Sequence, residues 1–331
     1  MRLRYLVAPL VLVVVAAAAL WTIPADDFLF TPDRAKPLED RLEVEDAKPA
    51  RGEVFYVDVF VRRATLLEQL LPFTRPDGST VVPKSALLPP GTSEEERDRE
   101  NAVDMQQSEV VASAVALRAL GYDVTVVPKG ARVEAVTTGS PAEGKLRRGD
   151  VVVAVDGKRV RALADLSREI GRREPGQRVR LTVRRGDRSL TLAMNTAEAD
   201  DDPGRPVVGI LVTQDADIEL PIRVDIDLGQ VGGPSAGLPF ALEIARMLGQ
   251  DVTHGCAVAA TGELAIDGTV LPVGGLKQKT IGARRADVDV FVVPAGRNAE
   301  DARKSADGLP VIPVESFQQA LQKLATADLN C

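Results

Sequence analysis

The chain has 331 residues, of which 45% are hydrophobic and 27% are charged, so it can bury more than one core and is not globally disordered. Lysine and arginine number 41 against 48 acidic residues, and the net charge of −7 argues against a nucleic-acid partner, which normally requires a basic excess. One histidine and two cysteines exclude a multi-histidine metal centre, a thiolate zinc site and a disulfide scaffold. We expect neither a metal nor an organic cofactor.

An uncharged apolar run extends from Tyr5 to Ile23, close to the ~20 residues that a helix needs to cross a bilayer. Arg2 and Arg4 precede it and acidic residues follow it, so the positive-inside rule places the rest of the chain outside the cytoplasm. Residues 1–30 are therefore predicted to be a single-pass transmembrane anchor. A cleaved signal peptide is the alternative, although the apolar region of a signal peptide is usually shorter.

The composition of the chain changes after the apolar run. Residues 24–50 are rich in proline and charge, which is typical of a linker. Apolar and polar residues then alternate in EVFYVDVFV, residues 53–61, and this period of two predicts a single β-strand.

A helix is predicted over residues 103–120, where apolar residues recur on one stripe, and Gly121 is predicted to end it. The preceding residues 82–101 contain three prolines and a run of charges, which indicates a solvated loop. Ser93 and Glu96 have the spacing of a capping box, so a helix that begins there is the alternative.

Residues 124–198 are predicted to form a β-rich module, because strand-like runs at 132–136, 151–155, 179–183 and 189–194 are separated by glycine-containing turns. The stretch GSPAEGKLRRGDVVVAVDGKRV, residues 139–160, resembles the core of bacterial PDZ domains. The resemblance implies that the module captures a peptide as an added strand and holds its C-terminal carboxylate with backbone amides. Residues 128–136 are a weak candidate for that carboxylate loop, and a purely architectural role is the alternative.

Residues 198–205, EADDDPGR, are acidic and unperiodic and predict a domain boundary. Strands and helices alternate after it. Near the start of a predicted helix at 236–248, GGPSAG places Ser235 among small residues, where the exposed amides and positive dipole of a helix N-terminus stabilise an oxyanion. A second predicted helix, at 275–286, carries Lys277 and Lys279. Taken alone, each motif also fits an ordinary capped or solvent-facing helix.

Together the two motifs resemble the Ser–Lys dyad of Lon-type proteases. GPSAG is followed by TGE at Thr261–Glu263 and by PVGGLKQK at 272–279, and residues 104–120 are similar to the helix that precedes the serine motif in that family. The implied fold is α+β, with a Lon-type proteolytic domain assembled from residues 50–122 and 205–331 and the PDZ domain at 124–198 inserted into it. The arrangement is similar to the membrane-anchored, YlbL-type Lon-like proteases of bacteria, which implies a bacterial cell membrane with the catalytic part outside the cytoplasm.

The resemblance implies a role for each site residue. Ser235 is the nucleophile and Lys279 its general base, which must lose its proton and therefore needs a buried, dry site. Thr261 orients the lysine amine, and backbone amides near Ser235 and Gly233, beside Pro234, form the oxyanion hole. The resemblance also implies a homo-oligomer, commonly a hexamer.

Three residues are predicted to lie outside the chemistry. The Ser–Lys pattern needs no histidine, so His254 is predicted to be structural. Cys256 is predicted to be a core thiol, and the terminal Cys331 to be exposed without a clear role.

The leading hypothesis is an ATP-independent, membrane-anchored serine endopeptidase. The chain has no G-x-x-x-x-G-K-[ST] motif and hence no P-loop, so its substrates are expected to be unfolded or flexible. A non-catalytic, anchored PDZ adaptor is the alternative, and a different Ser–Lys hydrolase of the signal-peptidase kind is a third hypothesis that the GPSAG context disfavours.

Overall fold

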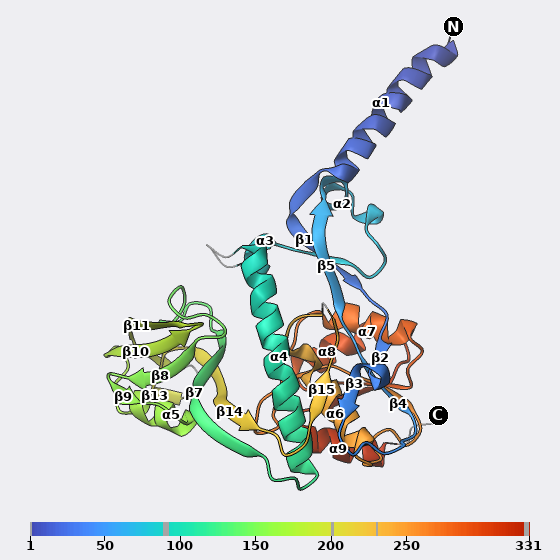
Figure 1. The fold of residues 1–331 in the computed structure, drawn as a ribbon. Coiled ribbons are helices and arrows are strands. Elements are labelled where there is room, and N and C mark those ends of the chain that lie inside the picture. The colour runs from blue at the N-terminus through green and yellow to red at the C-terminus, as the bar shows by residue number, and fades with distance from the viewer. Residues whose placement is uncertain (1, 89–92, 200–201, 230, 328–330) are drawn as a thin grey trace. The chain divides into compact units, whose positions relative to one another are not determined.

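The computed structural model describes the backbone of residues 2–88, 93–199, 202–229, 231–327 and 331, and their side chains except those of residues 2–10 and 13. The chain divides into two compact units (Figure 1). The first unit contains residues 1–121, 222–264 and 268–331, and the second contains residues 122–221 and 265–267.

A five-stranded sheet forms the centre of the first unit, in the order β2-β4-β16-β19-β20. The strands are β2 (Lys36–Pro37), β4 (Glu53–Tyr56), β16 (Ala257–Ala260), β19 (Val290–Pro294) and β20 (Val311–Val314). The last four run parallel, whereas β2 pairs antiparallel with β4. All of β19 is buried, as expected for a parallel strand that is covered on both faces.

Helices lie between or after these strands in the chain: α6 (Gly237–Met247), α7 (Leu276–Arg285), α8 (Arg297–Arg303) and α9 (Phe317–Thr326). The helices predicted at 236–248 and 275–286 are therefore confirmed. Two short strand pairs complete this part of the unit, β3 (Leu42–Val44) with β15 (Val224–Ile226), and β17 (Glu263–Leu264) with β18 (Val270–Leu271).

The long helix α4 (Glu94–Ala119) packs against α6. The Ser93 hydroxyl accepts a hydrogen bond of 3.1 Å from the backbone N–H of Glu96, which satisfies one amide of the first turn. The loop predicted for residues 82–101 is thus wrong from Glu94 onward, and the cap at Ser93 is the correct alternative. Gly121 follows the helix with a φ of 86°, the left-handed conformation that commonly ends helices.

A second, three-stranded sheet has the order β5-β1-β6, with β1 (Pro24–Pro32) between β5 (Val59–Thr65) and β6 (Thr80–Val82). The linker predicted over 24–50 is therefore wrong at its start. Phe28 and Leu29 of β1 are 2% and 0% exposed. Prolines and aspartates flank this short apolar run in the sequence, so its composition does not predict a strand. The run acquires its buried face only by pairing with β5 and β6.

The single strand predicted over 53–61 is also wrong, because the chain leaves one sheet and enters the other within it. β4 ends at Tyr56 and pairs with β16, whereas β5 begins at Val59 and pairs with β1. Val57 and Asp58 form the connection. The alternation of side chains continues through the break, so the sequence pattern does not reveal it.

Helix α1 spans Arg2–Thr22. Among the residues that the structure describes, no helix is both long and apolar enough to cross a bilayer. The predicted span over 5–23 includes the side chains of residues 5–10 and 13, which lie outside the described part.

The second unit contains a sheet of order β11-β10-β8-β7-β14, with the short β9 (Lys158–Arg159) paired to β8. Its main elements are β7 (Thr125–Val136), β8 (Val151–Val155), helix α5 (Leu163–Gly171), β10 (Arg178–Arg185), β11 (Arg188–Asn195) and β14 (Ile210–Glu219). The unit ends at Pro221 instead of the predicted residue 198, because β14 pairs along its length with β7. The residues predicted as a boundary instead belong in part to a hairpin of β12 (Ala197–Ala199) and β13 (Asp202–Val207).

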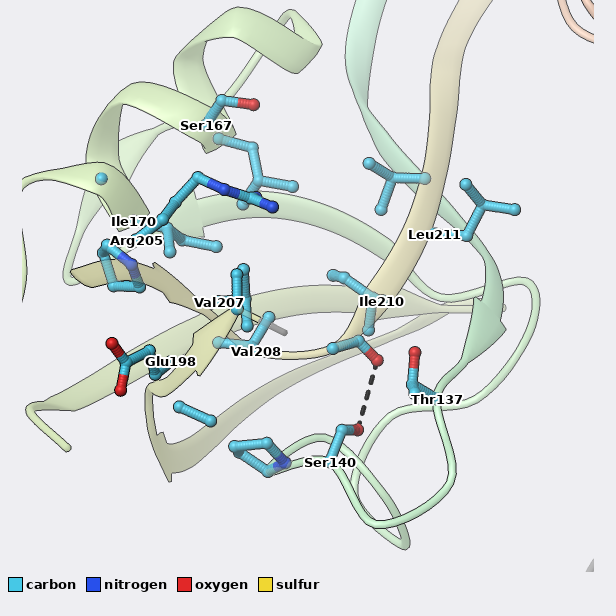
Figure 2. A pocket seen from close by; sticks show the side chains of 18 of the residues that line it. Thr137, Ser140, Ser167, Ile170, Glu198, Arg205, Val207, Val208, Ile210 and Leu211 are labelled. Atoms are coloured by element: carbon cyan, nitrogen blue, oxygen red, sulfur yellow. Dashed lines mark hydrogen bonds between the residues drawn. The ribbon is translucent and has the colours of Figure 1, made fainter. Parts of the chain in front are cut away.

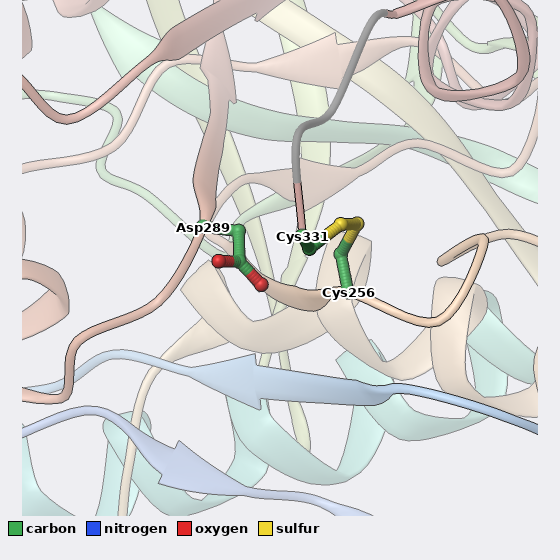
Figure 3. Close-up of side chains that lie close together, drawn as sticks. All are labelled: Cys256, Asp289 and Cys331. Carbon is green, nitrogen blue, oxygen red and sulfur yellow. A yellow bond between two sulfur atoms is a disulfide. The ribbon is translucent and has the colours of Figure 1, made fainter.

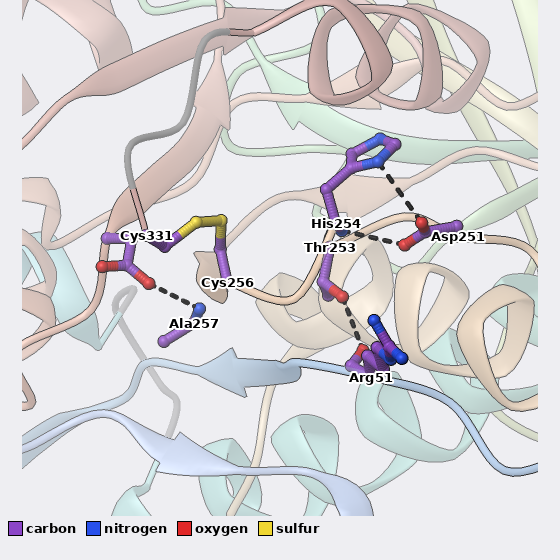
Figure 4. The surroundings of a disulfide bond; sticks show 8 residues. Arg51, Asp251, Thr253, His254, Cys256, Ala257 and Cys331 are labelled. Carbon is purple, nitrogen blue, oxygen red and sulfur yellow. Dashed lines mark hydrogen bonds and ion pairs between the residues drawn. A yellow bond between two sulfur atoms is a disulfide. The ribbon is translucent and has the colours of Figure 1, made fainter.

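Cys256 and Cys331 form a disulfide with a Cα–Cα distance of 5.5 Å (Figures 3 and 4), which is in the usual range for such bonds. The predictions of a free core thiol at Cys256 and of an exposed Cys331 without a role are therefore wrong. The partners are 75 residues apart in the sequence, and only the fold brings residue 331 beside the start of β16.

Candidate active site

Ser235 lies in the 3₁₀ turn η3 (Pro234–Ala236), directly before α6. Gly233 enters the turn with a φ of 90°, which favours glycine because a side chain strains this conformation. The Ser235 carbonyl accepts hydrogen bonds from the Gly262 N–H at 2.9 Å and the Thr261 hydroxyl at 3.2 Å. These bonds fix the backbone of the serine and leave its side chain half-buried.

Lys279 projects from the first turn of α7. Gly275 precedes the helix in the left-handed conformation, with a φ of 72°, and its carbonyl accepts from the Lys279 N–H at 2.9 Å. Lys279 is 4% exposed, whereas Lys277 is exposed and its amine lies 3.4 Å from the Ser79 carbonyl. The two lysines therefore lie on different faces of the helix, as the sequence predicts.

The Lys279 amine contacts the other two predicted site residues, Ser235 and Thr261. Its Nζ lies 2.7 Å from Ser235 Oγ and 2.9 Å from Thr261 Oγ1. Thr261 is fully buried and its N–H donates to the Val292 carbonyl of β19 at 3.0 Å. The structure thus brings together Ser235, Lys279 and Thr261 with the relative positions that a nucleophile, a base and an orienting hydroxyl require.

Burial lowers the pKa of Lys279 from its ordinary 10.5 to about 7, and the negative charge of Asp58 opposes this shift. Removal from water disfavours the ammonium form, and the hydroxyls of Ser235 and Thr261 are neutral partners that do not restore the full stabilisation of a charge. A substantial fraction of Lys279 is therefore deprotonated near neutral pH.

Asp58 belongs to a charge cluster that sequence reasoning missed. Lys36 Nζ lies 3.1 Å from Asp58 Oδ2 and 2.8 Å from Asp33 Oδ2. Burial raises the pKa of Asp58 while Lys36 lowers it, and the second carboxylate oxygen, Oδ1, is buried without a hydrogen-bond partner. The only sequence signal was an acid inside an apolar, strand-like run.

Gly233 and Pro234 occupy the predicted turn, but in a different role. The Gly233 N–H donates to the Asn101 carbonyl of α4 at 2.8 Å, and the Pro234 carbonyl accepts from the Ser108 hydroxyl at 3.1 Å. The structure therefore does not present the Gly233 amide as an open oxyanion donor, contrary to the prediction. Instead, α4 holds the turn that carries Ser235.

His254 lies in the loop before β16 and pairs with Asp251 at 3.4 Å (Figure 4). Its backbone N–H also donates to the Asp251 carboxylate at 2.9 Å. Lys279, and not His254, is the base within hydrogen-bond distance of Ser235 Oγ.

Cys256, Asp289 and Cys331 place two sulfur atoms and a carboxylate oxygen within 4.8 Å of one another (Figure 3). The sulfur atoms are joined in the disulfide, so neither is a thiolate ligand. Asp289 accepts a hydrogen bond of 2.8 Å from the Ala257 N–H. This group ties Cys331 to the start of β16.

The second unit contains a cavity of about 830 Å³ between helix α5 and residues 206–210, where β13 ends and β14 begins (Figure 2). Apolar side chains dominate these two walls, among them Leu166, Ile170, Val208 and Ile210. The Ser140 hydroxyl donates to the Gly209 carbonyl at 3.2 Å. At Gly209 a Cβ atom would lie 2.2 Å from that of Ser140 and φ is 78°, so only glycine fits this turn.

Residues 128–136, the weak candidate for a carboxylate loop, lie within strand β7 and do not line this cavity. Residues 206–210, at the end of β13 and the start of β14, line the cavity instead. Sequence reasoning assigned these residues to the next domain. Their signal was PVVGI, residues 206–210, a glycine within an apolar run before a strand.

Comparison with known proteins identifies two domains. Residues 216–327 match the family model of the Lon protease (S16) C-terminal proteolytic domain, and residues 118–196 match that of the PDZ domain. The predicted resemblance to Lon-type proteases that carry a PDZ domain is therefore confirmed at the level of these domains. The mixed helix and strand content agrees with the predicted α+β class.

Each of two curated relatives matches less than a third of this chain. The Lon protease of Paraburkholderia phytofirmans is 42% identical over 101 residues, which cover 30% of this chain and 11% of the relative. The Lon protease of Campylobacter jejuni is 35% identical over 94 residues, which cover 27% and 12%. The match thus spans about a tenth of the length of these relatives.

Among solved structures, the PDZ domain of the SdrC-like protein from Listeria innocua is 24% identical, with a TM-score of 0.24. The aligned region covers 25% of this chain and 92% of that structure.

Proposed function

We propose that this protein is an ATP-independent serine endopeptidase in which Ser235 is the nucleophile and Lys279 the general base. The distance of 2.7 Å between Lys279 Nζ and Ser235 Oγ carries the proposal. It is supported by the burial that lowers the pKa of Lys279 to about 7, because a lysine acts as a base only when it is neutral.

Each step of peptide hydrolysis has a group to perform it. The neutral amine of Lys279 accepts the Ser235 proton while Oγ attacks the peptide carbonyl, and the resulting ammonium keeps the Thr261 hydroxyl as an acceptor at 2.9 Å. Lys279 then gives this proton to the leaving amine, and an acyl-enzyme remains on Ser235. A water molecule, deprotonated by the same lysine, releases the second product and regenerates the serine.

The absence of a P-loop motif from the sequence supports ATP independence and substrates that are already unfolded or flexible. We further propose that the cavity beside α5 binds substrate or partner peptides, because its apolar walls suit the side chain of a peptide added to a sheet edge. Anchoring in a bacterial cell membrane through the apolar N-terminal run, with the catalytic part outside the cytoplasm, and assembly into a homo-oligomer complete the proposal.

The test is degradation of a permanently unfolded protein by the full chain in detergent, without ATP. Ser235→Ala and Lys279→Ala should each remove cleavage, whereas Lys277→Ala, on the same helix but exposed, should retain it. Cleavage that survives in Ser235→Ala refutes the mechanism. If the wild type cleaves nothing but binds C-terminal peptides, the non-catalytic adaptor is the better description.

A further inference from the structure

Five large apolar side chains are exposed where α1 meets the three-stranded sheet β5-β1-β6. They are Trp21 (52% exposed), Ile23 (45%), Leu70 (65%), Leu71 (39%) and Phe73 (82%). We call this group the junction patch. It combines the end of α1 with the short helix α2 (Leu66–Leu70) and the 3₁₀ turn η2 (Pro72–Thr74). Single exposed apolar residues are common on proteins, but a contiguous group usually marks an interaction site.

The two halves of the junction patch are joined through the backbone. The Leu66 N–H donates to the Ile23 carbonyl at 3.0 Å, and Pro24 of β1 pairs with Thr65 of β5. Helix α2 also packs against α1 (Figure 1). The residues that follow Leu66 are thus held beside the last turn of α1.

Polar contacts beneath the patch hold its apolar side chains outward. Thr65 and Glu68 form a reciprocal capping box at the start of α2, and Glu68 is buried and paired with Arg62 at 2.5 Å. Arg75 donates to the Glu68 carbonyl at 2.6 Å, and the Thr74 hydroxyl donates to the Leu71 carbonyl at 2.7 Å. The exposure of Leu70, Leu71 and Phe73 is therefore built into the local structure.

We propose that the junction patch inserts into the interfacial layer of a lipid bilayer. A lipid bilayer is the partner that the neighbouring part of α1 indicates. The apolar side chains of Val11, Leu12, Val14 and Val15, which precede the patch on α1, are also exposed. Lipid that surrounds this part of α1 would therefore reach the patch. Trp21 has the apolar body and polar N–H that place tryptophan at membrane interfaces. This inference rests on the membrane anchoring under Proposed function.

Docking of the patch has a consequence for the active site. Gln278, the neighbour of Lys279 on α7, donates to the Gly78 carbonyl at 3.1 Å and to the Thr80 hydroxyl at 2.9 Å. Thr80 begins β6, which pairs with β1, the strand that follows α1. The three-stranded sheet therefore connects the patch to α7 directly, without a flexible linker. This arrangement favours substrates that present an unfolded segment of their chain close to the membrane surface.

Tryptophan fluorescence tests the inference on the full chain in phosphatidylcholine vesicles with brominated acyl chains, which quench tryptophan only at the bilayer. The chain has one tryptophan, so the wild type reports Trp21 and hence the anchor. A Trp21→Phe, Phe73→Trp double variant reports the patch, and Trp21→Phe, Gln322→Trp is the control, on an exposed position of α9 in the same unit. We expect at least twofold quenching in the first two proteins and none in the control.

Three outcomes overturn the inference, and they are distinguishable. Quenching of Trp21 without quenching of the Phe73→Trp reporter means that the anchor holds and the patch does not dock. No quenching in either protein refutes the membrane anchoring itself. A blue-shifted Phe73→Trp emission that depends on protein concentration, without quenching by brominated lipid, assigns the patch to contact with a second copy of the chain. Proteolysis by Ser235 is independent of all three results.

Discussion

Replacement of Lys279 by methionine should stabilise the fold at pH 7, and this gain should be lost as the pH rises. In the folded protein burial keeps the pKa of Lys279 at about 7, whereas in the unfolded chain it returns to 10.5. Between these values the unfolded chain binds more protons than the folded protein, so the stability of the wild type rises with pH from about 7 to about 10.5. A methionine of similar length has no such charge to lose.

The magnitude follows from these two pKa values. Since one pKa unit corresponds to about 1.4 kcal/mol, keeping the lysine buried costs about 4 kcal/mol of folding free energy at pH 7 and about 1 kcal/mol at pH 10. Lys279→Met also loses the bonds to Ser235 and Thr261, each worth about 1 kcal/mol. That loss is nearly the same at both pH values. The stability difference between Lys279→Met and the wild type should therefore change by about 3 kcal/mol between pH 7 and pH 10, and this change comes from the lysine charge alone.

Urea unfolding of the full chain in detergent, followed by far-UV circular dichroism at pH 7 and pH 10, measures this change. Lys277→Met is the matched control, because Lys277 is exposed on the same helix, and it should follow the pH dependence of the wild type. Other titrating groups are common to all three proteins and cancel in the comparison. An identical pH dependence in the wild type and Lys279→Met would refute the view that burial depresses the pKa of this lysine.

Three further predictions concern the chemistry, the disulfide and the cavity. Acylation of Ser235 by a fluorophosphonate should rise with pH with a midpoint near 7, and Asp58→Asn should move that midpoint lower, because the Asp58 charge raises the pKa of Lys279; a midpoint that moves upward would contradict this assignment. Cys256→Ser should lower the free energy of unfolding by about 4 kcal/mol under oxidising conditions, given the 75-residue separation, and reduction of the wild type should reproduce the loss. Ile170→Lys, within the apolar cavity, should weaken binding of C-terminal peptides at least tenfold in a fluorescence titration while Ser235 acylation is unchanged; unaltered peptide affinity would place the binding site elsewhere.

The local sequence was sufficient to predict a helix where the motif lies directly at the start of that helix. The glycines before α6 and α7 have the positive φ that their turns require, and the helices that follow begin within one residue of their predicted start. Prediction failed where pairing with a distant strand decides the outcome. β1 pairs with β5 and β6, so a stretch that resembles a linker becomes a sheet.

The PDZ-type unit illustrates the same limit. Its last strand, β14, pairs with β7, and the register joins Ile210 to Val136. The cavity is therefore lined by α5 together with residues of the hairpin of β12 and β13 and the start of β14. Prediction from the sequence places these two parts of the cavity lining in different domains, because the acidic, proline-containing hairpin between them has the composition of a domain boundary.

The sequence by itself determined the pair Ser235 and Lys279, the accompanying Thr261 and the resemblance to Lon-type and PDZ domains, because these depend on short runs of residues with a fixed local geometry. Only the tertiary structure decided that Lys279 is buried enough to lose its proton, that the charge of Asp58 acts on it, and that Cys256 meets Cys331. Desolvation and pairing depend on which distant residues surround a group, and neither composition nor periodicity contains that information.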